Sequence, residues 1–211
     1  MKTLLGKKIG MTQIFAETGE VVPVTVIEAG PVVVTQIKTI ETDGYNAVQI
    51  GYDDAKPQRV NKPLTGHFKK AGVPVKKHLA EFTADDVEAY ELGQILTASV
   101  FEMGKKLDIT GISKGKGIQG TIKRHGYHRG PMSHGSKHKR LVGALEAGTY
   151  PSRVFKGNAG PGRMGRDTIT LQNLDLVRVI EDRNLLLVKG AVPGKKGGLL
   201  RIRYAVKGQE K

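Results

Sequence analysis

A glycine-rich motif flanked by lysines is the first part of this sequence whose residue types could do chemistry. Residues 115–120 read Gly-Lys-Gly-Ile-Gln-Gly, which matches the G-x-G-x-x-G pattern of dinucleotide-binding loops. A dinucleotide site also needs a helix in a βαβ unit and an acidic residue about 20 positions later, but position 140 is arginine and the nearest acid is Glu146. We therefore interpret the glycines as backbone that approaches phosphates closely, with Lys114 and Lys116 neutralising the phosphate charge.

Four histidines, His125, His128, His134 and His138, are candidate metal ligands. Zinc sites usually add cysteine or carboxylate, and the chain has no cysteine. The basic neighbours of these histidines, which would repel a cation, are Arg124, Arg129, Lys137, Lys139 and Arg140. Histidine in such surroundings is better suited to stacking on bases or to bonding phosphate and ribose. We expect neither a metal nor a cofactor.

Catalysis needs a base, an acid or a nucleophile in a fixed geometry. Ser133 and Ser136 are close in sequence to His134, but the carboxylates between residues 104 and 166 are only Asp108 and Glu146. Nothing in the local sequence could therefore orient the histidine. We expect no enzymatic active site and no small-molecule substrate.

Positive charge is concentrated in one stretch of the chain. The 211 residues carry a net charge of +14, and residues 104–166 contribute +12 of it, from 14 basic and two acidic side chains. The same stretch holds 14 of the 28 glycines and few large apolar side chains, so it cannot bury enough surface to offset the entropy of ordering. This composition predicts a segment that binds a polyanion and needs that partner in order to fold.

Folded RNA is the polyanion that this stretch fits best. Single-strand binders rely on several aromatic stacking platforms, and the stretch has only Tyr127, Tyr150 and Phe155. Duplex-DNA binders usually present a recognition helix, which the glycine density disfavours. The expected RNA-contacting residues are Lys114, Lys116, Lys123, Arg124, His125, His128, Arg129, Ser133, His134, Lys137, His138, Lys139, Arg140, Arg153, Lys156, Arg163 and Arg166.

Strand patterns lie on both sides of the basic stretch. Gly19 and the Asp43-Gly44 pair separate β-branched runs and predict two hairpins. The predicted strands are residues 11–15, 21–28, 32–40, 45–52, 79–82, 95–101, 106–112, 168–171, 174–180 and 185–188. A short helix is predicted over residues 66–70, in a proline-punctuated elaboration of the core. Because the chain leaves a β core and returns to it, the basic stretch is predicted to be an insertion loop.

Short strands separated by turn signals are typical of a small barrel, since closure removes exposed strand edges. We therefore predict a mainly β fold in a single domain. Its antiparallel β-barrel core comprises approximately residues 1–112 and 167–211, and its long irregular basic extension comprises approximately residues 113–166. No apolar run is long enough to span a membrane, and glycine excludes an amphipathic surface helix from the basic stretch. We expect a cytoplasmic protein without a membrane partner.

One distinctive run of residues extends from Phe101 through Asp108, Gly111 and residues 113–120 to Arg124. Further distinctive segments are residues 6–15, 22–28, 129–136, 152–157 and 184–194. Together these segments resemble the bacterial large-subunit ribosomal protein L3 family, and the first run is similar to that family's signature. The resemblance implies a β-barrel near the surface of the large ribosomal subunit and an extension that passes through ribosomal RNA toward the peptidyl-transferase centre. It also implies early binding to ribosomal RNA during assembly, contacts with neighbouring ribosomal proteins, and no catalysis.

Residue by residue, the resemblance places Lys114, Lys116, Lys123 and Arg124 at the base of the extension and residues 128–140 in its inner loop. After the position of Arg140 the family commonly shows Pro-Gly-Ser, whereas this chain reads Leu-Val-Gly-Ala. Some relatives carry a methylated glutamine nearby. Residues 143–153 contain no glutamine, so we expect no such modification.

Two other functions stay open at the level of sequence. An RNA-modifying enzyme could use the basic loop to hold its substrate, and it would require a pocket with a carboxylate or a metal. A nucleoid-type DNA-binding protein would bind duplex DNA at least as tightly as ribosomal RNA. The 2′-hydroxyl and the folded shape of RNA separate these possibilities.

Overall fold

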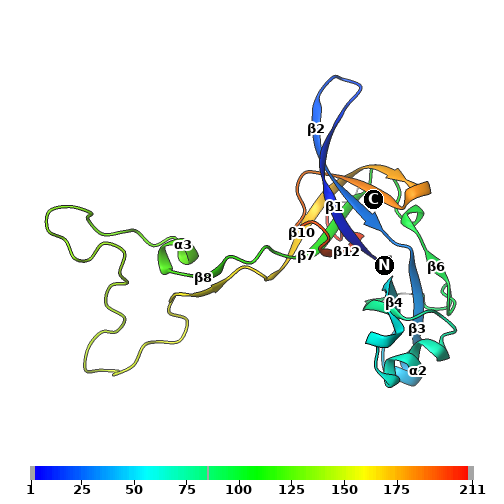
Figure 1. The fold of residues 1–211 in the computed structure, drawn as a ribbon, viewed down its shortest axis with the longest axis horizontal. Helices are drawn as coiled ribbons and strands as arrows, with labels where there is room; N and C mark the ends of the chain where they lie inside the picture. Colours follow the sequence, from blue (N-terminus) through cyan, green and yellow to red (C-terminus); the bar gives the residue numbers. More distant parts are fainter. Residues whose placement is uncertain (1–2, 85, 209–211) are drawn as a thin grey trace. The chain divides into compact units, whose positions relative to one another are not determined.

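The computed structural model describes residues 3–84 and 86–208 (Figure 1). The chain forms two compact units: unit 1 comprises Met1–Ser113 and Thr168–Lys211, and unit 2 comprises Lys114–Asp167. Antiparallel strands dominate the secondary structure, which confirms the prediction of a mainly β protein. Within the described ranges, no helix has the length and apolar character needed to cross a membrane.

Six strands of unit 1 pair in a closed antiparallel ring, in the order β1-β12-β7-β10-β11-β2. They are β1 (Thr3–Phe15), β2 (Val21–Ala29), β7 (Lys106–Ile112), β10 (Thr168–Ile180), β11 (Leu185–Lys189) and β12 (Leu199–Tyr204). Strand residues alternate between the two faces of a sheet, and apolar ones such as Ile27, Ile109 and Ile202 are fully buried. The interior of this ring is therefore a packed apolar core.

A second antiparallel sheet in unit 1 has the strand order β5-β4-β3-β6. Its strands are β3 (Val32–Lys38), β4 (Ala47–Asp54), β5 (Lys76–Thr83) and β6 (Ile95–Leu96). The hairpin predicted over residues 32–52 is present, but it belongs to this sheet and not to the six-stranded ring, which is a closed barrel. Val34, Val48 and Phe82 of the sheet join Leu4 and Ile27 of the barrel in one hydrophobic cluster.

Helices and short turns connect the strands of unit 1. The helix predicted over residues 66–70 begins earlier, as α2 (Lys62–Lys70), because the side chain of Asn61 caps it by accepting a hydrogen bond from the Leu64 N–H at 3.1 Å. The Asp43-Gly44 connection is one helical turn, α1 (Ile40–Asp43), and not a tight two-residue turn; Gly44 ends it with φ at 81°. Two of the three 3₁₀ turns in the described ranges cover Pro57–Arg59 and Glu181–Arg183.

The structure corrects two of the strand predictions and adds a strand that was not predicted. The strand predicted over residues 95–101 ends at Leu96, because Ala98–Val100 forms a 3₁₀ turn. Residues 168–171 and 174–180 form one strand, β10, with an irregularity where Asn173 has a positive φ of 57°. Strand β12 was not predicted, although it completes the ring by pairing with both β1 and β7.

Candidate nucleic-acid interface

Two short strands hold the outgoing and returning limbs of unit 2 together. Strand β8 (Gly117–Gln119) pairs antiparallel with β9 (Gly162–Met164), with Ile118 opposite Arg163. The Lys116 N–H also donates to the Met164 carbonyl oxygen at 2.9 Å. The backbones approach so closely beside this ladder that a Cβ at Gly165, whose φ is 75°, would overlap the Lys114 carbonyl oxygen. The predicted irregular loop therefore contains a short sheet.

A helix opens at the glycine motif, where irregular backbone was predicted. Helix α3 (Thr121–His125) begins directly after Gly120 and ends at Gly126, whose φ is 73°. Its last turn is entirely basic, which suits the negative end of the helix dipole. The preceding strand, β8, pairs only with an antiparallel partner in the described sheets, so the motif lacks the parallel βαβ arrangement of a dinucleotide site.

Two of the expected RNA-binding side chains have a structural partner inside unit 2. Arg124 Nη1 donates to the Gly160 carbonyl oxygen at 2.8 Å, and His125 Nε2 lies 3.0 Å from the same oxygen. These bonds join helix α3 to the returning limb. A guanidinium has five N–H donors, so Arg124 keeps others for a phosphate. Sequence reasoning missed the structural role because Gly160 is 35 residues away from His125.

The inner loop, residues 128–140, is closed by a backbone hydrogen bond. The Gly130 N–H donates to the Lys139 carbonyl oxygen at 2.9 Å. A Cβ at Gly130 would overlap the carbonyl oxygen of His138, so only glycine fits at this closure. His134 and Gly135 reverse the chain at the far end with φ values of 56° and 69°. The loop thus has a defined path with its side chains directed outward.

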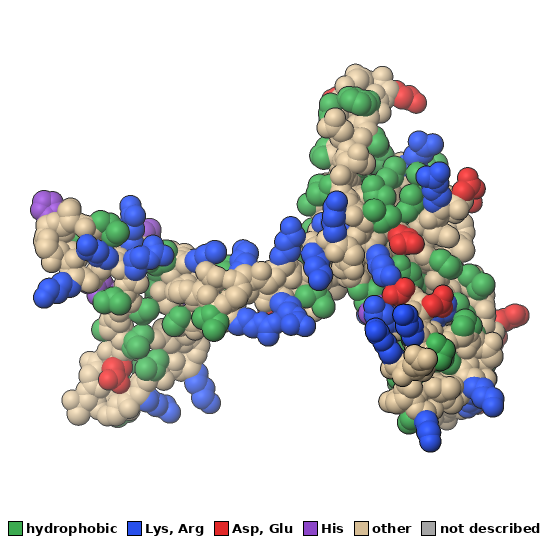
Figure 2. All heavy atoms as spheres, in the orientation of Figure 1, with side chains coloured by type: hydrophobic (Ala, Val, Ile, Leu, Met, Phe, Trp, Pro, Cys, Tyr) green, Lys and Arg blue, Asp and Glu red, His purple; other side chains and the backbone are tan. Residues whose placement is uncertain are grey.

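All 17 side chains expected to bind RNA are exposed. Unit 2 carries 12 Lys and Arg side chains against two acids, Glu146 and Asp167. Figure 2 shows the basic side chains spread along the whole of unit 2. Because like charges at this density repel one another, an anionic partner would stabilise the arrangement.

Large exposed apolar side chains lie among these cations. Tyr150 is 90% exposed, Ile118 84% and Phe155 60%. An aromatic ring with this exposure can stack on an unpaired base or pack against ribose. The aromatic residues are visible in the sequence, but a sequence does not show whether a ring is buried. Their exposure adds Tyr150 and Phe155 to the candidate interface.

The four histidines of unit 2 do not assemble into a site. In the part of the chain that the structure describes, no three His, Asp or Glu side chains are grouped as ligands for a metal ion. His125 lies instead against Gly160, and its ring centroid is 6.2 Å from that of Tyr127. Their positions suit contacts with RNA at separate points.

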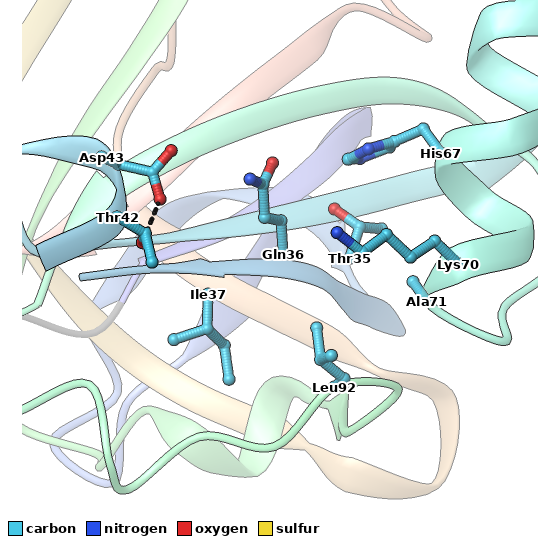
Figure 3. A pocket seen from close by; sticks show the side chains of 9 residues that line it. All are labelled: Thr35, Gln36, Ile37, Thr42, Asp43, His67, Lys70, Ala71 and Leu92. Carbon is cyan, nitrogen blue, oxygen red and sulfur yellow. Dashed lines mark hydrogen bonds between the residues drawn. The ribbon is translucent and has the colours of Figure 1, made fainter.

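A cavity of about 430 Å³ opens on the second sheet of unit 1 (Figure 3). Its polar lining includes Asp43 and His67, the residue types that an enzyme would use. However, the His67 Nε2 lies 2.7 Å from Gln49 Oε1, which also accepts a hydrogen bond from Thr35. The Asp43 carboxylate accepts from Thr42 at 2.8 Å. Each of these two side chains is therefore hydrogen-bonded to a neighbouring side chain.

Known proteins match this chain in sequence over nearly its full length. Residues 67–184 match the family model for ribosomal protein L3. The chain is 61% identical over 207 residues to the large ribosomal subunit protein uL3 of Finegoldia magna, which covers 98% of this chain and 99% of that protein. It is 55% identical over 208 residues to uL3 of Carboxydothermus hydrogenoformans, covering 99% of each. A chain that aligns with these relatives over nearly its full length belongs to the ribosomal protein L3 family.

Proposed function

We propose that this protein is a structural constituent of the large ribosomal subunit and binds large-subunit ribosomal RNA directly. The observation that carries the proposal is the charge of unit 2, with 12 exposed cations and two acids in a compact unit of 54 residues. The names of the relatives, both proteins of the large ribosomal subunit, support the same role. The protein acts in the cytoplasm, where it associates with ribosomal RNA and with other ribosomal proteins.

Unit 2 binds RNA mainly by neutralising phosphates. Each Lys or Arg that replaces a condensed counterion gains the entropy of releasing that ion. Glycines lower the steric bulk of the backbone, so that its N–H groups also reach phosphate oxygens. The β8–β9 ladder and the Arg124 bond to Gly160 fix the spacing of the two limbs before RNA arrives.

The protein contributes binding and assembly rather than a reaction. Lys114, Lys116, Lys123 and Arg124 hold the base of the extension on RNA. The inner loop, residues 128–140, reaches toward the peptidyl-transferase centre. Its mixture of histidine, serine and glycine suits close fitting against RNA, because small side chains permit short contacts.

Competition binding tests this proposal. Labelled large-subunit ribosomal RNA fragments are titrated with the full-length protein in a salt series, with duplex DNA of equal length as competitor. We expect the RNA fragments to bind more tightly than the DNA at every salt concentration, because the protein recognises folded RNA. Equal affinity for both would support a DNA-binding protein instead. Chemical change of the RNA during incubation would support a modifying enzyme.

A further inference from the structure

The hairpin formed by β1 and β2 extends past the barrel as a two-stranded ribbon. β1 pairs with β12 only from Thr3 to Lys7, and β2 pairs with β11 only from Val24 to Glu28. Beyond these points, residues 11–15 pair with the start of β2, and no third strand of the described chain continues alongside them. We call residues 11–23 the distal ribbon; Figure 1 shows it as the looped end of β1 and β2.

One face of the distal ribbon is mainly apolar and is exposed. The cross-strand pairs Phe15–Val21 and Gln13–Pro23 place these side chains on the same face, which Met11 shares two residues before Gln13. Phe15 is 70% exposed, Val21 53% and Met11 52%. A two-stranded ribbon has no second layer against which to bury such a face, and it is marginally stable alone in water. Apolar residues gathered in this way mark an interaction surface.

The charge of the distal ribbon is opposite to that of the rest of the chain. Residues 9–23 contain no Lys or Arg, whereas Glu17 and Glu20 lie exposed at the turn. In Figure 2 the end of this hairpin shows apolar and acidic side chains. RNA phosphates would be repelled by the two carboxylates and would find no cation within the ribbon itself to neutralise them. A surface rich in Lys or Arg would be attracted.

We propose that the distal ribbon docks on another protein of the large ribosomal subunit. The partner presents an apolar patch that covers Met11, Phe15 and Val21, bordered by Lys or Arg side chains that pair with Glu17 and Glu20. This inference rests on the proposed function, because it places the chain in the large subunit. It assigns protein contacts to the ribbon, as distinct from the RNA contacts of unit 2.

Site-specific photo-cross-linking tests the inference in assembled particles. Phe15 is replaced by p-benzoylphenylalanine in the full-length chain, and large subunits that contain it are purified and irradiated. Ile40, which is 65% exposed on unit 1, provides a control position for the same replacement. We expect Phe15 to cross-link to one protein, and mass spectrometry to locate the adduct in an apolar segment beside Lys or Arg.

Charge reversal supplies the second measurement. Glu17→Lys with Glu20→Lys should lower the cross-link yield by about tenfold, which corresponds to about 1.4 kcal/mol. Glu88→Lys with Glu91→Lys is a matched control, since both residues are exposed on unit 1 and have the same spacing. It should leave the yield unchanged.

The outcomes separate this inference from the proposed function. Subunits that contain the chain but show cross-links from Phe15 to ribosomal RNA, or no adduct at all, would overturn the docking proposal alone. A cross-link yield that is insensitive to reversal of Glu17 and Glu20 would overturn the assigned partner chemistry. Absence of the wild-type chain from large subunits would overturn both proposals.

Discussion

The carboxylate of Asp108 on β7 accepts a hydrogen bond from the backbone N–H of Asn173 on β10 at 3.1 Å. Asn173 has a positive φ of 57°, at the point where the ladder between these strands shifts register. The side chain therefore supplies an acceptor where the ladder is interrupted. Its other oxygen lies 3.3 Å from Arg203 Nη2 on β12. Asp108, which is 1% exposed, thus ties three neighbouring barrel strands together.

Replacing Asp108 should destabilise unit 1. Asp108→Ala removes the acceptor of the Asn173 N–H and the counter-charge of Arg203, whose buried Nε already lacks a hydrogen-bond partner among the described atoms. We expect the free energy of unfolding to fall by about 2 kcal/mol, because the Asn173 N–H loses its acceptor and the Arg203 guanidinium, which is 35% exposed, loses its counter-charge. Urea denaturation followed by circular dichroism measures the change.

Two further variants separate the contributions at this site. Asp108→Asn keeps an oxygen for Asn173 and should cost less than alanine. Asp175→Ala, at an exposed acid of the neighbouring strand β10, should change stability by no more than about 0.5 kcal/mol. Equal stability of the Asp108→Ala and Asp175→Ala proteins would contradict the role assigned to Asp108.

Local sequence patterns were enough to predict most of the strands of unit 1. β7 was predicted with its observed ends, and both early hairpins were recognised, because β-branched alternation and glycine turns are local signals. In β12, buried Leu200 and Ile202 alternate with arginines, so a period-two signal is present, but it is short and follows a Lys-Lys-Gly-Gly run. The division of strands between barrel and second sheet depends on long-range pairing, which local sequence does not specify.

The candidate interface was predictable in composition but not in geometry. Charge and glycine content identified the stretch that became unit 2. Strands β8 and β9 have three residues each and lie more than 40 residues apart in the chain, so no local sequence pattern predicts that they pair. The bonds of Arg124 and His125 to Gly160, over 36 and 35 residues, could not be predicted from local sequence for the same reason. These two side chains become structural supports only where the two limbs meet.

Stability should fall as the pH drops below the ordinary histidine range. Burial, reinforced by the charge of Lys77, holds the pKa of His78 below its usual value of 6.5. A depressed pKa means that the folded state prefers neutral His78, so its contribution is complete above about pH 6.5 and is lost as the pH falls through the folded pKa. Urea midpoints measured from about pH 7.5 to about pH 5 should decline for the wild type and decline less for His78→Gln.

Below the pH range of this experiment, the carboxylates of Glu81 and Asp53 also affect stability. The Lys38 ammonium lowers the pKa of Glu81 from 4.5, and the Lys7 ammonium lowers that of Asp53 from 3.8, so both carboxylates lose their contributions only in stronger acid. His134→Gln, at an exposed position of the inner loop, serves as the control. A His78→Gln protein with the same pH dependence as the wild type and this control would refute the assignment.

Arg124 should protect the returning limb of unit 2 from proteolysis in the absence of RNA. Residues 126–161 contain no helix or strand, so we expect limited proteolysis of the free protein to begin there. Arg124→Ala removes the bond to Gly160 and should accelerate cleavage near residues 156–163 several-fold. Lys123→Ala makes the same charge change on the neighbouring residue and should not. Equal cleavage rates in the two variants would show that the Arg124 bond to Gly160 does not protect the returning limb.

Charge removal from the base of unit 2 should weaken RNA binding in a salt-dependent way. Lys114, Lys116 and Lys123 are exposed, and changing each of them to Gln removes one phosphate neutralisation, which should reduce the slope of log K against log salt by roughly 0.7 to 0.9. The triple variant should therefore reduce the slope by about 2 to 3. Lys56, Lys69 and Lys70 of unit 1, changed together to Gln, form a control of equal charge. If both triple variants reduce the slope of log K against log salt equally, the lysines of unit 2 have no special role in RNA binding.

The closure of the inner loop should matter for peptide-bond formation more than for incorporation of the protein into subunits. Gly130→Ala would force a Cβ against the His138 carbonyl oxygen and disturb the bond from Gly130 to Lys139. The exposed cations at the base of unit 2 stay in place, so assembly should continue. We expect purified subunits that carry Gly130→Ala to contain normal amounts of the protein, yet to show an altered peptidyl-transfer rate or altered sensitivity to drugs that bind the catalytic centre.

Gly143→Ala is the matched control, because a Cβ at Gly143 meets no atom within 4 Å. It adds the same methyl group to the same unit without affecting the closure. His134→Ala, at the tip of the loop, leaves the closure intact. It tests whether loss of a side-chain contact alone changes peptidyl transfer or drug sensitivity. If Gly130→Ala and His134→Ala subunits match those of Gly143→Ala in peptidyl transfer and drug sensitivity, the inner loop does not act at the catalytic centre, and its shape serves RNA binding alone.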